Sequence, residues 1–379
     1  MKIIIAPDSF KGSLSALQLC GAVSSGIRSV VPDADIVELP VADGGEGTVD
    51  SLVHACGGTR VEVQVRGPLG EPVTAVYGIL KDGTAVVEMA QASGLPLVPE
   101  ARRNPLAASS YGTGELIRAA LDRGCRQFLI GLGGSATNDG GAGMLEALGV
   151  RWYGADGVPL PSEGGALAEL AGFDASGMDP RLAECRFVAA TDVRNPLCGP
   201  EGASAIFGPQ KGATPDMTQA LDRALRQWAD VIRRQTGIDV LTLPGGGAAG
   251  GMGAGLHAFL GAPLRSGIDI VLEKAKFEAQ LRDADLVITG EGRLDRQTLS
   301  GKAIAGICRK AREAGVPVVA LCGSLELPAE QLDELGLTAA FSIVRKPCDL
   351  QEAVGRAAEW TSEAAAQMMR LLQQGIRWR

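Results

Sequence analysis

The sequence is poor in residues on which several common kinds of active site depend. Only two histidines, His54 and His257, occur in 379 residues, and each lies among apolar residues at helical spacing. We therefore expect both histidines to pack against the protein, and we exclude His-centred catalysis and a His-rich metal site. The eight cysteines are scattered, without a C-x-x-C pair or metal-ligand spacing. They predict reduced thiols and a cytoplasmic protein.

Long apolar runs and excess positive charge are also absent. No run approaches the roughly 18 residues of a membrane-spanning helix, and the apolar segment at residues 1–6 is too short for a signal peptide. The net charge is −8. This charge argues against binding to nucleic acid or to an anionic membrane surface, so we expect neither as a partner.

Glycine is the residue in excess, with 52 of 379 residues against a usual share of about 7%. There is no G-X-Y period, which excludes collagen, and a hydrophobic content of 46% excludes a disordered chain. Two runs are dense, with six glycines in residues 131–143 and seven in residues 245–255. Such runs expose backbone N–H groups that cradle phosphate, or they permit close packing or a hinge, and the sequence leaves these alternatives open.

Strands that alternate with helices at both ends of the chain predict a parallel sheet. We place strands at residues 2–6, 35–39, 284–289, 316–322 and 339–344, with a closing helix at 350–374. The middle of the chain differs, because it contains an antiparallel hairpin about Asp82-Gly83, helices near 113–123 and 216–236, and strands near 126–131 and 186–191.

The predicted fold is α/β: a flavodoxin-like doubly wound domain interrupted by an inserted mixed α/β domain. The first domain comprises residues 1–66 and 266–379, and the second comprises residues 67–265. The active site would lie in the cleft between the two domains. Neither a Walker A loop nor a G-x-G-x-x-G after the first strand is present, which disfavours a P-loop NTPase and an ordinary Rossmann dehydrogenase.

Charged residues follow the predicted strands at the edge where open parallel sheets bind ligands. The loops after the strands at 2–6, 35–39 and 284–289 supply Asp8, Ser9, Lys11, Asp43, Glu46, Glu291, Arg293 and Asp295. Carboxylates can hold Mg²⁺ or accept a hydroxyl proton, and cations can neutralise phosphate. In the middle of the chain, Asp192 at a strand end fits a general base and Lys211 fits a phosphate contact. Each of these charged residues has a structural alternative, as a helix cap or a solvated charge. For the segment before Pro196 the alternative is a turn.

Five segments, taken in order, resemble those of the bacterial type I glycerate kinases. They are APDSFKG at 6–12, ADGGEGT at 42–48, GLGGSATNDGG at 131–141, TDVRNPL at 191–197 and TGEGRLD at 289–295. The resemblance runs from residue 6 to at least residue 302. It implies ATP-dependent phosphorylation of D-glycerate with a divalent cation in the cytoplasm, usually to 2-phosphoglycerate, on a flavodoxin-like domain interrupted by a second α/β domain. Residue spacing does not distinguish this product from 3-phosphoglycerate.

From position in the chain we assign roles to these residues. Asp192 is the first choice for the base and Asp8 the second, and Arg293 and Lys211, with Lys11 close by, would bind phosphate or carboxylate. ATP would contact the loop at 131–141 through Gly133, Gly134, Ser135 and Asn138. D-glycerate would contact Ser9, Asn195 and Arg293. The candidate ligands of Mg²⁺ are Asp43, Glu46, Asp139 and Glu291. A kinase of a related hydroxy acid and a non-catalytic sugar-acid sensor are the alternatives, and a homodimer is compatible with the sequence.

Overall fold

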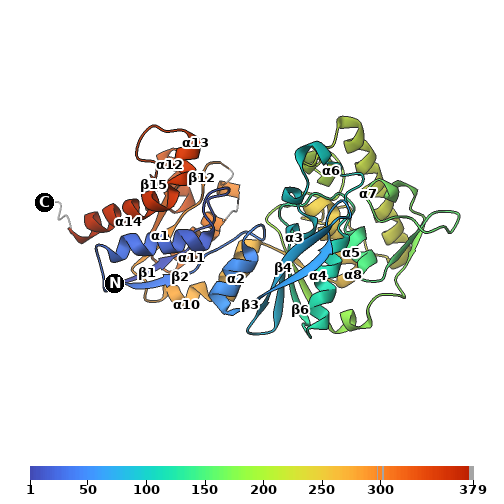
Figure 1. The fold of residues 1–379 in the computed structure, drawn as a ribbon, viewed down its shortest axis with the longest axis horizontal. Helices are drawn as coiled ribbons and strands as arrows, with labels where there is room; N and C mark the ends of the chain where they lie inside the picture. Colours follow the sequence, from blue (N-terminus) through green and yellow to red (C-terminus); the bar gives the residue numbers. More distant parts are fainter. Residues whose placement is uncertain (297, 301–302, 375–379) are drawn as a thin grey trace. The chain divides into compact units, whose positions relative to one another are not determined.

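The computed structural model describes residues 1–296, 298–300 and 303–374. The chain divides into two compact units. One unit, which we call the five-stranded unit, comprises Met1–Asp43, Asp50–Gly57 and Ile268–Arg379. The other unit, which we call the six-stranded unit, comprises Gly44–Val49 and Gly58–Gly267. The first strand and the last helix therefore belong to the same unit (Figure 1).

The five-stranded unit contains every strand predicted for the two ends of the chain. These strands are β1 (Lys2–Ile5), β2 (Asp35–Glu38), β11 (Leu286–Thr289), β13 (Val318–Cys322) and β15 (Ala339–Ser342). They form one sheet in the order β15-β13-β11-β1-β2, and every neighbouring pair is parallel. Continuous β-branched and apolar runs such as KIII produce these strands, because a parallel sheet buries both of its faces.

Helices cover both faces of this sheet. Ile3 and Ile5 face a core that α1 (Ala16–Arg28) and α14 (Ala357–Gln373) complete, while the intervening Ile4 is also fully buried. A Cβ at Gly26 of α1 would lie 2.1 Å from the backbone oxygen of Ser362 in α14, so glycine is what permits this close approach. On another side, α11 (Ala303–Glu313) contacts β11. The closing helix predicted at 350–374 is two helices, α13 (Leu350–Gly355) and α14, which a non-helical Arg356 separates.

The six-stranded unit has a mixed sheet in the order β10-β9-β6-β5-β4-β3. Its strands are β3 (Gly58–Arg66), β4 (Pro72–Leu80), β5 (Thr84–Glu88), β6 (Gln127–Gly131), β9 (Arg186–Ala190) and β10 (Leu264–Arg265). The hairpin about Asp82-Gly83 is confirmed, since β4 and β5 pair antiparallel and the Thr84 N–H donates to Asp82 Oδ1. Strand β3 was not predicted. It pairs with β4 along its whole length, so the six-stranded unit includes Gly58–Arg66 as well as Gly44–Val49, which both precede the predicted boundary at residue 67.

Both helices predicted for the middle of the chain are present, as α4 (Tyr111–Asp122) and α7 (Pro215–Thr236). Helix α7 begins after Thr214, whose side chain accepts the Met217 N–H, and ends at Gly237, whose φ is +79°. Such an N-cap and a left-handed C-terminal glycine are the usual boundaries of a helix. Residues of α7 pack with α5 (Ala142–Ala147) and α8 (Met252–Leu260) in one core around Trp152 and Trp228.

The two glycine-rich runs pack against each other inside the six-stranded unit. A Cβ at Gly250 would lie 2.0 Å from the Thr137 backbone oxygen, and one at Gly255 would lie 2.4 Å from that of Gly140. The Gly140 N–H also donates to the Gly250 oxygen at 2.9 Å. Of the alternatives that the sequence left open, close packing therefore accounts for these glycines.

Two further two-stranded sheets and several short helices complete the fold. The sheets pair β12 (Arg293–Leu294) with β14 (Ser324–Leu325) and β7 (Arg151–Tyr153) with β8 (Gly172–Asp174). The remaining α-helices are α2 (Thr48–Cys56), α3 (Ala90–Ser93), α6 (Ala203–Phe207), α9 (Gly267–Lys274), α10 (Phe277–Leu281) and α12 (Ala329–Leu335).

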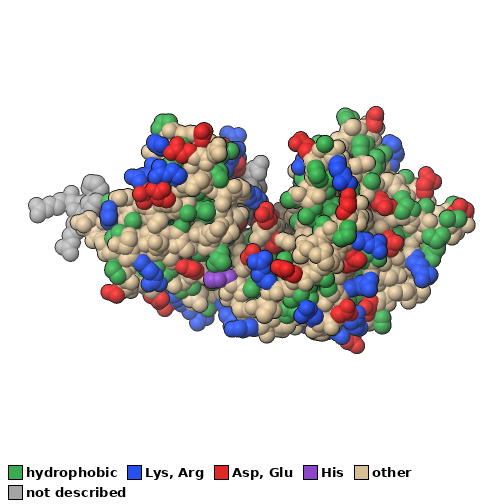
Figure 2. All heavy atoms as spheres, viewed as in Figure 1, with side chains coloured by type: hydrophobic (Ala, Val, Ile, Leu, Met, Phe, Trp, Pro, Cys, Tyr) green, Lys and Arg blue, Asp and Glu red, His purple; other side chains and the backbone are tan. Residues whose placement is uncertain are grey.

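The surface agrees only partly with what the composition predicts. The packing role expected for His54 is wrong, because that residue is exposed on α2, whereas His257 is half-buried with Nδ1 3.3 Å from the Ala262 oxygen. All eight cysteines are free thiols. Among the described residues, no helix is long and apolar enough to cross a membrane. Figure 2 shows acidic and basic side chains interspersed on the visible face.

Candidate active site

A cavity of about 720 Å³ lies at the carboxyl ends of β1, β11, β13 and β15 in the five-stranded unit. This is the edge at which an open parallel sheet is expected to bind its ligand. The cavity brings together seven residues that the sequence placed in these loops: Asp8, Ser9, Lys11, Asp43, Glu291, Arg293 and Asp295. Residues from three separate parts of the chain thus meet in one unit.

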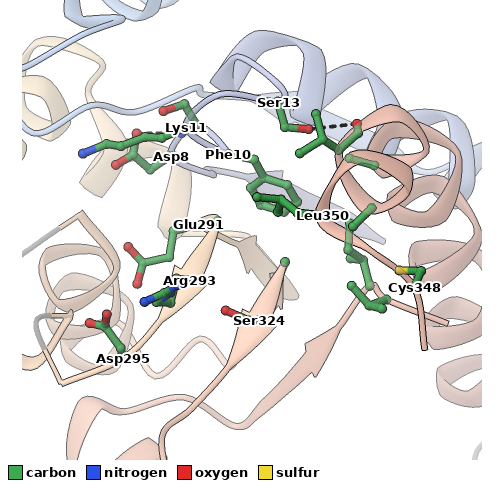
Figure 3. Close-up of a pocket in the computed structure, with 18 of the residues that line it drawn as sticks. Asp8, Phe10, Lys11, Ser13, Glu291, Arg293, Asp295, Ser324, Cys348 and Leu350 are labelled. Carbon is green, nitrogen blue, oxygen red and sulfur yellow. Dashed lines mark hydrogen bonds between the residues drawn. The ribbon is translucent and has the colours of Figure 1, made fainter. Parts of the chain in front are cut away.

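The two sides of the cavity differ in chemical character. Figure 3 shows the carboxylates of Asp8, Glu291 and Asp295 with the cations of Lys11 and Arg293 on one side, which we call the charged end. Figure 3 shows Phe10 and Leu350 away from these charges. We call the apolar side chains of the lining the apolar arm: Phe10, Ile343, Val344, Leu350 and Val354. A ligand that fills the cavity must therefore carry both a strongly polar part and an apolar part.

Asp8 is a buried carboxyl of the charged end. Its side chain is only 8% exposed, and its Oδ1 accepts the Ser9 N–H at 2.6 Å. Burial raises the pKa of Asp8 to about 7, and the neighbouring carboxylates of Asp43 and Glu291 contribute, while the Ser9 N–H and Lys11 oppose the shift. A buried carboxyl with a raised pKa beside cations is a pattern common at sites of proton transfer.

Glu291 is held next to Asp8 by the backbone of the strand ends. The glutamate is 7% exposed, and its Oε1 accepts the hydroxyl of the fully buried Thr298. A Cβ at the preceding residue, Gly290, would lie 2.1 Å from the Leu321 oxygen, so glycine lets this loop run close to β13. The carboxylate is therefore fixed by its neighbours and does not swing freely in solvent.

The acidic residues of the charged end form a limited metal-binding set. Among residues 1–296, 298–300 and 303–374, no group of three or more His, Cys, Asp or Glu is arranged to hold a metal ion by itself. Mg²⁺, however, commonly uses one or two carboxylates together with substrate phosphates. Asp43 and Glu291 supply such a pair of oxygen donors in the same cavity.

The cations of the charged end are accessible. Lys11 is exposed, and the side chain of Arg293 is 65% exposed, with its Nε 3.4 Å from Glu326 Oε1. An exposed ion pair of this kind contributes little free energy, so an anionic ligand can replace Glu326 as the partner of Arg293.

Lys211 occupies a different environment, in the six-stranded unit. Its side chain is buried, and its Nζ donates to Ser135 Oγ and to the Thr137 oxygen, both at 2.7 Å. Burial lowers the pKa of Lys211 to about 7, and the charge of Asp139 opposes this shift. In this structure Lys211 anchors the glycine-rich loop from within, which differs from the phosphate contact expected for it.

Asp139 and Asn138 also serve the interior of the six-stranded unit. The wholly buried carboxylate of Asp139 accepts the Ser110 N–H and hydroxyl and the N–H groups of Gly141 and Gly143. The amide of Asn138 donates to Ser204 Oγ at 2.9 Å. With its oxygens already engaged in this way, Asp139 fits a structural role, and the expectation that it binds a metal is not supported by its position.

The other candidates of this unit are likewise engaged with backbone. Gly133 donates to the Gly44 oxygen at 3.2 Å and packs on Gly45, while Gly134 has a φ of +75°. Asp192 Oδ1 accepts the N–H of Gly267, the last residue of this unit, at 3.0 Å.

Asn195 and Glu46 complete the set. The amide of Asn195 donates to the Glu201 oxygen at 2.8 Å. Glu46 is exposed and belongs to the six-stranded unit, whereas the cavity is lined by residues of the five-stranded unit. Neither residue is part of the cavity lining in the five-stranded unit.

Sequence reasoning missed the apolar arm. Ile343 and Val344 follow β15, and Leu350 and Val354 lie on α13, so they occupy the same sheet edge as the charged loops. The position of these residues could have been predicted, because the carboxyl end of the strand expected at 339–344 lies at the ligand-binding edge of the sheet like those of the other predicted strands. They were not chosen as candidates because apolar side chains carry no catalytic or ion-binding group.

Comparisons with known proteins give one consistent result. Residues 3–373 match the model of the "Glycerate kinase family". The chain is 52% identical to a glycerate kinase of Bacillus subtilis (strain 168), with 96% of each chain covered. It is 48% identical to the glycerate 2-kinase of Escherichia coli (strain K12), with 100% of this chain and 99% of the relative covered. A crystal structure of "putative glycerate kinase 2" from Salmonella typhimurium LT2 matches with a TM-score of 0.89 at 52% identity, covering 99% of each chain.

Proposed function

The chain belongs to the glycerate kinase family and is thus a kinase, and on that basis we propose that it transfers the γ-phosphoryl group of ATP to D-glycerate, forming 2-phosphoglycerate and ADP. The similarity to the Escherichia coli glycerate 2-kinase over the full chain is the observation that carries the substrate and the regiochemistry. We also propose that the five-stranded unit is a flavodoxin-like domain into which the six-stranded unit is inserted. The order β2-β1-β11-β13-β15 supports this, since it is 2-1-3-4-5 along the chain.

We assign Asp8 the role of catalytic base. As the glycerate hydroxyl oxygen bonds to the γ-phosphorus, the bond from that phosphorus to the bridging oxygen of ADP breaks, and the hydroxyl proton passes to the Asp8 carboxylate. Asp8 lines the cavity and faces the other charged residues there. Asp192, the first choice from the sequence, instead accepts a backbone N–H at the end of the six-stranded unit.

The remaining residues of the charged end neutralise the phosphates. Lys11 and Arg293 supply two accessible cations in the same cavity as Asp8. Asp43 and Glu291 would hold Mg²⁺, because paired carboxylate oxygens are the donors that this hard cation prefers. When bound, Mg²⁺ neutralises charge on the β- and γ-phosphates.

A coupled assay tests the proposed reaction and its product. The purified protein is incubated with D-glycerate and MgATP, and enolase is added without phosphoglycerate mutase. A signal from enolase is expected, because only 2-phosphoglycerate is its substrate. ADP release without that signal would assign the 3-isomer, and ADP release no faster than in the absence of D-glycerate would contradict the proposal.

A further inference from the structure

The apolar arm is larger than the proposed acceptor substrate requires. Glycerate is a three-carbon acid with no extended apolar part for this arm to contact. The cavity, at about 720 Å³, falls in the range of roughly 300–1,000 Å³ that is typical of sites for much larger organic ligands. Much of its lining therefore serves another molecule or another part of a molecule.

Three of the five residues of the apolar arm are exposed, although all three are apolar. Leu350 is 80% exposed, and Val344 and Val354 are each 37% exposed. A single exposed apolar side chain needs no explanation, but several that converge on one cavity mark a surface that a ligand covers. The buried ring of Phe10 forms part of the same lining.

We infer that the apolar arm binds the purine base of the nucleotide, so that the whole nucleotide site lies in the five-stranded unit. This inference rests on the proposed function, which requires a ligand that is flat and apolar at one end and polyanionic at the other. The lining matches that division, with Leu350 at one end and Lys11 and Arg293 at the other. It replaces the glycine-rich loop at 131–141 as the expected nucleotide contact.

The arm holds the base by apolar contact. Ser13 and Asp349 border it, but the Ser13 hydroxyl donates to the Val354 oxygen at 3.1 Å and Asp349 Oδ1 accepts the Glu352 N–H at 2.7 Å. Side chains engaged in this way contribute little to reading the edge of a base. Because apolar pockets discriminate weakly between ligands of similar shape, we expect ADP and GDP to bind within about tenfold of each other.

Direct binding of MgADP, measured by titration calorimetry, tests the inference. Leu350→Asp and Val344→Asp place a charge against the base, and we expect each to raise the Kd for MgADP by about tenfold or more. Leu371→Asp is the matched control, because Leu371 is 56% exposed on α14 and does not line the cavity. The control should leave the Kd unchanged. In kinetics, the cavity variants should raise the KM for ATP and leave the KM for D-glycerate unchanged.

The outcomes separate this inference from the proposed function. Cavity variants that bind MgADP as tightly as the wild type, in an enzyme that phosphorylates D-glycerate, would overturn the inference alone. Binding that is lost in the cavity variants, in a protein inactive on D-glycerate, would support the inference and overturn the substrate assignment. A wild-type protein that binds no MgADP would overturn both. Equal melting temperatures for the three variants would show that lost binding is not lost folding.

Discussion

The backbone N–H of Asp8 donates to the carbonyl oxygen of Gly290 at 2.8 Å. This hydrogen bond continues the pairing of β1 with β11 beyond the last residue of each strand. Asp8 and the neighbour of Gly290, Glu291, are thereby held in one cavity although they are far apart in the sequence. The charge repulsion and burial that follow from this pairing underlie the predictions for Asp8 and Glu291 below.

The stability of the protein should depend on pH through Asp8. In the folded state burial raises the pKa of Asp8 from 3.8 to about 7, so between these values the folded protein binds a proton that the unfolded chain releases. The free energy of unfolding therefore falls as pH rises through this window. Asp8→Asn removes the effect and should be more stable than the wild type at pH 8, on the order of a few kcal/mol.

Urea denaturation in metal-free buffer measures this difference. The gap between Asp8→Asn and the wild type should be large at pH 8 and small at pH 4, where the wild-type carboxyl is protonated in the folded state and close to half protonated in the unfolded chain. A gap of the same size at both pH values would show that Asp8 does not titrate as described.

Mg²⁺ should relieve the repulsion among the carboxylates of the charged end. We expect millimolar MgCl₂ to raise the melting temperature of the wild type at pH 8, because a cation that binds only the folded state stabilises it. Glu291→Gln should lose most of this increase. Glu46→Gln is the matched control and should retain it, since Glu46 is exposed and lies outside the cavity lining. An equal response from both variants would remove Glu291 from the metal site.

The packing of the two glycine-rich runs can be tested with alanine. At Gly255 in α8 a Cβ would lie 2.4 Å from the Gly140 backbone oxygen, so Gly255→Ala should destabilise the fold by about 1–3 kcal/mol. At Gly21 in α1 nothing lies within 4 Å of the added Cβ. Gly21→Ala should therefore be neutral or stabilising by up to about 1 kcal/mol. Thermal melts that rank the two variants in the opposite order would contradict the close packing.

Sequence reasoning located the strands and the charged end of the cavity because both have local signals. Runs such as KIII at β1 are continuous and apolar, and Asp8, Lys11 and Glu291 follow strands directly. Strand β3 was missed although it carries a local signal, because Val61, Val63 and Val65 alternate with exposed polar residues as expected of a strand with one buried face.

Tertiary contacts decided what the local sequence could not. Glycine runs suit phosphate binding and close packing equally, and only the approach of Gly250 to Thr137 distinguishes the two. Likewise, Asp192 and Asp8 are both aspartates that follow a strand, and their surroundings differ only in the folded chain. The apolar arm joins Phe10 to residues more than 300 positions away, a proximity with no trace in local composition.

The kcat of Asp8→Asn, compared with that of Asp192→Asn, tests the central claim most directly. If Asp8 accepts the glycerate proton at the edge of the five-stranded sheet, Asp8→Asn should lower kcat by about 10² or more with little change in the KM for D-glycerate. Asp192→Asn should keep kcat within about tenfold of the wild type. A near-normal kcat for Asp8→Asn, with a collapse for Asp192→Asn, would contradict the account and place the base in the six-stranded unit.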